Sequence, residues 1–78
     1  MDWAPLESSV LTAVAYSHDE HSLYLEFRSG AIYRYFDFPL HQYDEFLAAD
    51  SKGRYFSLHI RDRYRCQQVH ILTDRARR

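Results

Sequence analysis

The sequence is poor in cysteine and has no long apolar run. Its single cysteine, Cys66, cannot form a disulfide within the chain, whereas secreted domains of this size usually depend on several disulfides. No stretch approaches the roughly 18 consecutive apolar residues of a membrane-spanning helix. Residues 1–10 also lack the basic and apolar segments of a secretory signal. We therefore predict a cytoplasmic protein with no membrane role.

The motifs of common catalytic and metal sites are also missing. With two glycines in 78 residues, the chain has no glycine-rich phosphate loop. The possible nucleophiles Ser8, Ser9 and Cys66 have no evident base with an orienting partner. The spacings His18-x-x-His21 and Cys66-x-x-x-His70 occur in zinc sites, but a zinc site needs four ligands and there is no second cysteine. We predict that the protein is not an enzyme and that it holds no metal and no cofactor.

The length of 78 residues allows one hydrophobic core, so we predict a single domain over residues 1–78. The composition can fill that core, because 46% of the residues are hydrophobic and 17% are aromatic. A chain this short has few residues left to build a deep cleft, which favours a binding surface over a reactive pocket. Residues 73–78 form a basic tail, which we expect to be disordered.

The small net charge of −1 conceals two oppositely charged parts of the chain. Residues 1–50 carry a formal charge of −7, and residues 51–78 carry +6. This separation can direct a polyanion to one face of the fold, or it can let the two parts attract each other.

Hydrophobic alternation predicts three antiparallel strands, near residues 9–17, 22–28 and 31–37. A loop over Arg28, Ser29 and Gly30, with Gly30 in a left-handed bulge position, places Leu25 opposite Tyr33. In that register one face of the second and third strands is apolar, with Leu23, Leu25, Phe27, Tyr33 and Tyr35. The other face has Tyr24, Glu26, Arg28, Ile32, Arg34 and Phe36.

Two helices are predicted after the strands, near residues 40–49 and 52–63. Pro39 suits the first helical turn, and Ser51 can cap the second helix. The fold class is therefore α+β, a three-stranded antiparallel meander followed by two helices and a short C-terminal extension. Whether residues 67–72 form a strand stays open. The expected core residues are Phe27, Tyr33, Phe46, Phe56 and Ile60.

An ordered set of residues resembles the KTSC domain. The set is Ser8-Ser9, Val14-Ala15-Tyr16, Leu25-Glu26-Phe27-Arg28-Ser29-Gly30, Tyr33-Arg34-Tyr35, Pro39, Tyr43, Ala49, Ser51, Gly53, Tyr55-Phe56, Ile60-Arg61 and Tyr64. The resemblance covers about residues 8–64. The family takes its name from the C-terminus of some lysyl-tRNA synthetases and also occurs as free-standing small bacterial proteins. The resemblance implies the same meander and helices, supplies no catalytic residues, and suggests RNA binding by association with the synthetase.

Two groups of residues are candidates for binding nucleic acid. Exposed aromatic side chains beside arginines on a sheet are typical of several small RNA-binding folds, and the face opposite the core offers Tyr24, Phe36, Arg28 and Arg34. The second group is Arg54, Arg61 and Arg65, near the second helix. Each group also has a structural explanation, because the C-terminal segment could cover the sheet face and the arginines could be a solvated helix surface.

The function that we predict is a small non-catalytic binding module for RNA or for an RNA-associated protein. The alternative is a protein-interaction or dimerisation module in which Phe36, Ile32 and residues 69–72 contact a partner chain. We expect a monomer or a weak dimer in either case. Salt separates the two, because phosphate contacts weaken steeply as salt rises and apolar contacts do not.

Overall fold

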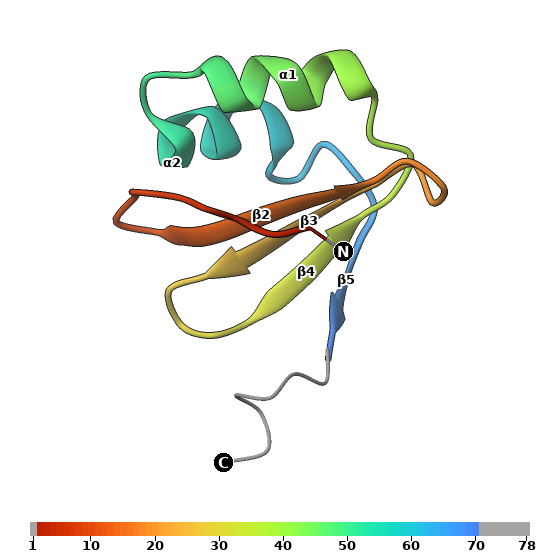
Figure 1. The fold of residues 1–78 in the computed structure, drawn as a ribbon, viewed down its shortest axis with the longest axis horizontal. Helices are drawn as coiled ribbons and strands as arrows, with labels where there is room; N and C mark the ends of the chain where they lie inside the picture. Colours follow the sequence, from red (N-terminus) through yellow and green to blue (C-terminus); the bar gives the residue numbers. More distant parts are fainter. Residues whose placement is uncertain (1, 71–78) are drawn as a thin grey trace.

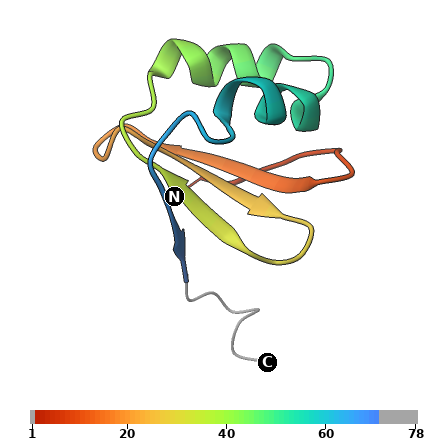
Figure 2. The ribbon, with the colours of Figure 1, turned by 180° about the vertical axis from the view of Figure 1, so that it is seen from behind.

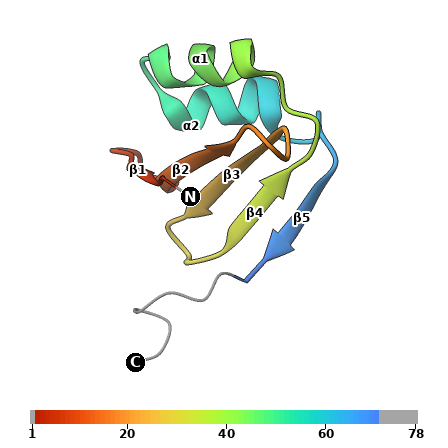
Figure 3. The ribbon, with the colours of Figure 1, turned by 45° about the vertical axis from the view of Figure 1, so that its right-hand side comes forward.

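The sheet has five antiparallel strands, whose order in space is their order in the chain. The computed structural model describes residues 2–70, so the predicted tail over residues 73–78 lies outside the described part. The strands are β1 (Ala4–Pro5), β2 (Leu11–Ser17), β3 (Ser22–Phe27), β4 (Ile32–Tyr35) and β5 (Cys66–Val69). Figure 3 shows β2 to β5 side by side, with β5 at one edge.

The three predicted strands are present as β2, β3 and β4, but the prediction understated the sheet, because it omitted β1 and left open the strand that is β5. β1 is only two residues long and contains Pro5, which is tolerated at a sheet edge because its missing N–H breaks no ladder there. β5 reads Cys-Gln-Gln-Val and is mostly exposed, so it has almost no apolar alternation. The central strands, which are half buried, carry the pattern that sequence analysis detects.

The predicted register of the β3–β4 hairpin is confirmed. Leu25 pairs with Tyr33, and the Phe27 amide donates to the Ala31 carbonyl at 2.8 Å. Gly30 has a φ of 97°, in the left-handed region where a side chain would be strained. Because this loop sets the register, it also decides which side chains of β3 and β4 face the core.

The first helix, α1 (Leu40–Ala48), begins at the predicted residue 40, but Pro39 does not stand in its first turn. Pro39 is extended and lies outside the helix as its N-cap. The second helical segment starts as predicted, because the Ser51 hydroxyl accepts a hydrogen bond from the Arg54 amide at 3.2 Å. It consists of α2 (Lys52–Tyr55) and a π-helical turn, η1 (Phe56–Ile60).

The prediction that the second helix continues to residue 63 was wrong. The Arg61 amide donates to the Phe56 carbonyl at 2.8 Å, which closes the wide turn. Asp62 then takes a positive φ of 62° and ends the helical path. From there the chain crosses to β5, so Arg61 and Arg65 do not share a helix face.

All three helical segments lie on one side of the sheet, as Figures 1 and 2 show from opposite directions. The core fills the space between the two layers, where Phe46, Phe56 and Ile60 are buried as predicted. Phe27 and Tyr33 are only partly buried and pack against the core. The full core cluster is Leu11, Val14, Leu23, Leu25, Tyr35, Phe38, Phe46, Phe56 and Ile60. Within residues 2–70, no helix has the length and apolar character needed to cross a bilayer.

Candidate nucleic-acid interface

The sheet face away from the helices, here called the outer face, gathers four of the predicted binding residues. Directly paired residues of antiparallel strands point to the same side, and Tyr24 pairs with Arg34. Phe36 follows two residues after Arg34, and its amide donates to the Arg65 carbonyl at 2.9 Å. The β4–β5 pairing thus brings Arg65, from the far end of the chain, to the same place.

Two guanidinium groups converge on one aromatic ring. The Cζ atom of Arg34 lies 4.2 Å from the centre of the Phe36 ring, and the Cζ atom of Arg65 lies 4.3 Å from it. These distances are well within the range of cation–π attraction. We call Arg34, Phe36 and Arg65 the Phe36 cluster. It places two positive charges beside a half-buried ring on the outer face.

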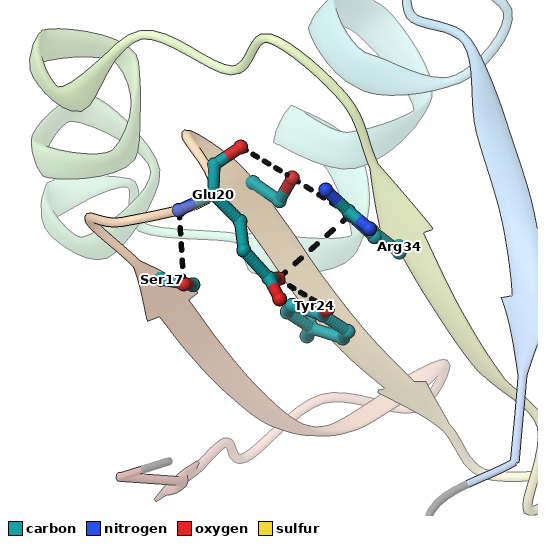
Figure 4. Close-up of polar contacts among 5 residues, drawn as sticks. Ser17, Glu20, Tyr24 and Arg34 are labelled. Atoms are coloured by element: carbon teal, nitrogen blue, oxygen red, sulfur yellow. Dashed lines mark hydrogen bonds and ion pairs between the residues drawn. The ribbon is translucent and has the colours of Figure 1, made fainter.

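A partly buried hydrogen-bond network holds Arg34 in place, as Figure 4 shows. The Arg34 Nε donates to the Ser22 hydroxyl at 2.8 Å, and that hydroxyl donates to the Glu20 carbonyl at 3.0 Å. The Glu20 carboxylate lies 3.9 Å from the Arg34 Nε. It also accepts a hydrogen bond from the Tyr24 hydroxyl at 2.6 Å. Ser22 is fully buried, so Arg34 is anchored through its Nε.

Tyr24 is not an open stacking platform, because Trp3 covers it. The two rings meet edge to face with centres 6.4 Å apart, and Tyr24 is only 6% exposed. Burial raises the pKa of Tyr24, and its hydrogen bond to Glu20 raises it further. The segment that covers this part of the outer face is therefore N-terminal, whereas the sequence analysis considered a C-terminal one.

The other candidate arginines lie apart from the Phe36 cluster. Arg28 donates from its Nε to the Ser9 carbonyl at 3.1 Å and also donates to the Ser8 carbonyl, so it holds the loop before β2. Arg54 is exposed on α2, in the helical layer. Arg61 follows η1, and its charge acts on the Tyr35 hydroxyl. The structure joins Arg34 and Arg65 into one cluster and leaves Arg28, Arg54 and Arg61 outside it.

The residues of the dimerisation alternative are placed differently. Ile32 pairs with Val69 across β4 and β5, so both belong to the sheet of one chain. Phe36 belongs to the Phe36 cluster, and residues 71 and 72 lie outside the described part.

Sequence reasoning missed three residues of the outer face. Trp3 lies in a segment with no alternation, Glu20 lies in a polar turn, and Ser22 reads as part of that turn. One signal was available. An aromatic residue on the polar side of a strand, such as Tyr24, can indicate that another segment packs over that side. Among the described residues, no group of three or more His, Cys, Asp or Glu side chains could hold a metal ion.

The fold is similar to that in a crystal structure of a KTSC domain protein from Yersinia pestis. The TM-score is 0.85 at 29% identity, and the match covers 88% of this chain and 97% of the other. A protein from Tsukamurella paurometabola, described only as a protein, is 39% identical over 61 residues. Those residues are 78% of this chain and 91% of that relative.

Longer relatives carry a similar segment as a small part of their length. A lysine–tRNA ligase from Nostoc is 40% identical over 63 residues, which are 81% of this chain and 11% of the ligase. The sequence profile of the KTSC domain matches residues 7–64. The chain therefore belongs to the KTSC domain family.

Proposed function

We propose that the chain is a non-catalytic RNA-binding module whose contact surface is the Phe36 cluster. The observation that carries this proposal is the convergence of two guanidinium groups on one ring at the sheet surface. Guanidinium groups bind phosphate oxygens, and aromatic rings on a sheet stack with unpaired bases. The relatives named lysine–tRNA ligase, which carry a similar segment, act on an RNA by name.

The two arginines have different parts in this proposal. Arg34 is anchored through Ser22 and is partly neutralised by Glu20, so it orients the ring more than it attracts a phosphate. Arg65 is exposed, and among residues 2–70 no acidic side chain forms an ion pair with it. Arg65 therefore supplies the phosphate contact. Because both guanidinium groups lie over the Phe36 ring, a base stacks on that ring when Arg65 turns away from it toward the phosphate.

A titration with a short single-stranded RNA, followed by fluorescence anisotropy at two salt concentrations, tests this proposal. Replacing Phe36 by Leu removes the ring and should cost about 1 to 3 kcal/mol of binding free energy, the usual value of one base stacked on an aromatic ring. Arg65→Ala should weaken binding and lower the salt slope by about 0.7, as expected for one lost phosphate contact on a single strand.

Arg54→Ala is the matched control, because it removes the same charge from the helical layer. Under this proposal it changes the affinity much less than Arg65→Ala does. Equal losses for the two variants would reduce the binding to net charge and contradict the assignment of the site. A wild-type chain that binds no RNA at low salt would overturn the proposal and favour the protein-interaction alternative.

A further inference from the structure

A second feature of the molecule lies where the β2–β3 turn meets α1. An open cavity of about 540 Å³ is lined there by Asp2, Tyr16, Ser17, His18, Glu20 and Tyr43. The volume suits a small molecule or one side chain of a partner. The proposed RNA surface and this cavity have different residues, although Glu20 touches both.

The aromatic part of the lining is held rigidly. The rings of Tyr16 and Tyr43 are stacked, with centres 5.0 Å apart and an angle of 20° between their planes. The edge of His18 meets Tyr16 at 5.1 Å. The Tyr16 hydroxyl donates to the Phe38 carbonyl at 2.5 Å, which fixes that ring from the far side. The cavity therefore has a preformed wall of aromatic rings.

The charged part of the lining is acidic. Asp2 and Glu20 contribute carboxylates, and no lysine or arginine is among the lining residues. Arg34 partly neutralises Glu20 from the outer face at 3.9 Å, so Asp2 is the freer charge. Tyrosine rings beside carboxylates attract organic cations, because the ring face has a negative electrostatic potential and the carboxylate has a negative charge.

We propose that this cavity binds an organic cation, either an alkylammonium or a guanidinium group. An organic ion fits better than a metal ion, because among the described residues, Asp2, His18 and Glu20 of the lining included, no group of three acidic, His or Cys side chains could hold a metal ion. The ring surface suits the apolar stem of such a ligand, and the carboxylates suit its charged end. The cation can be a free small molecule or the side chain of a basic peptide.

The test is a titration of the full chain, followed by the amide resonances in two-dimensional NMR. The probes are tetramethylammonium chloride, argininamide and a short arginine-containing peptide, each compared with sodium chloride at the same ionic strength. We expect saturable shifts that are confined to the residues lining the cavity. Binding of all three probes with similar affinity identifies a free cation as sufficient, and binding of the peptide alone identifies a partner's side chain.

Variants connect the shifts to the proposed contacts. Asp2→Asn alters an exposed residue outside the core and should weaken binding about threefold or more. Tyr43→Leu should weaken it further, and Tyr43→Phe, which keeps the ring, should bind nearly as well as wild type. Glu7→Gln removes a charge from another part of the surface and serves as the control, with no expected change.

Absence of saturable shifts for every probe, or equal losses in Asp2→Asn and Glu7→Gln, would overturn the proposal. The test also separates the two proposals. Phe36→Leu should abolish RNA stacking and leave cation binding intact. Tyr43→Leu should weaken cation binding and leave RNA binding intact.

Discussion

The two faces of the same sheet use different interactions. On the face toward the helices, Phe56 meets Phe27 and Tyr35 edge to face, with ring centres 5.3 and 6.1 Å apart. On the outer face, Ser22 and Tyr24 are buried, and their hydroxyl groups donate hydrogen bonds to Glu20. The face toward the helices therefore stabilises the fold by burying apolar surface area. The outer face instead holds charged side chains in defined positions through hydrogen bonds.

The largest expected effect lies on the apolar face. Phe56→Ala should lower the free energy of unfolding by about 3 to 5 kcal/mol, because it leaves a cavity among packed rings. Denaturation by urea measures this, and a domain so small should be largely unfolded. Leu58→Ala, at a residue that is 52% exposed, is the control and should stay within about 0.5 kcal/mol. An unfolding free energy that is unchanged in Phe56→Ala would mean that the face toward the helices does not stabilise the fold through these packed rings.

The next effect concerns the polar face. Ser22→Ala should lower the unfolding free energy by about 1 to 3 kcal/mol, because the Arg34 Nε loses its buried acceptor. The exposed Ser57 provides the matched control, and Ser57→Ala should be nearly neutral. Equal results for the two serines would mean that the outer network contributes no stability.

A third comparison uses pH. Burial raises the pKa of Tyr35 well above the ordinary tyrosine value of 10.0, and the nearby Cys66 raises it further. Above pH 10 the unfolded chain loses this proton while the folded chain keeps it, so stability falls as pH rises. The slope is at most about 1.4 kcal/mol per pH unit for one such group. Urea denaturation between pH 8 and 11 should show a shallower loss of unfolding free energy with rising pH for Tyr35→Phe than for wild type.

The smallest expected effect on stability is at Arg65. Because this side chain is exposed, Arg65→Ala should change the unfolding free energy by about 0.5 kcal/mol or less, although we expect it to weaken RNA binding. Thermal unfolding and RNA fluorescence anisotropy, measured on the same sample, would compare the effect of Arg65→Ala on stability with its effect on RNA affinity. A large loss of stability would mean that Arg65 holds β5 in place and would make any binding defect indirect.

The sequence was sufficient to predict the central hairpin, because Gly30 and the alternation of Leu23, Leu25 and Phe27 allow one register. It was also sufficient for the start of α2, because a capping serine acts within four residues. It could not reveal β1 and β5, which are stabilised by pairing with a neighbour and not by their own pattern.

The same limit applies to the candidate site. The sequence placed Arg34 and Phe36 on one face, because their spacing of two residues determines it. It placed Arg65 near the end of the second helix, because nothing in residues 61–65 predicts that the helix ends at Ile60. Trp3 was missed for a similar reason, since its contact with Tyr24 joins distant parts of the chain.

The pairing of β4 with β5 has a consequence for the order of folding. The hairpins formed by β2, β3 and β4 join segments that are close in sequence, whereas β5 can pair only after residues 36–65 have returned to the sheet. Closing a long loop is slower than closing a hairpin. We therefore expect β5 to dock last. Since Arg65 reaches Phe36 through that docking, a chain whose helices have not yet formed has no complete Phe36 cluster, and RNA binding through this cluster would be a property of the finished fold alone.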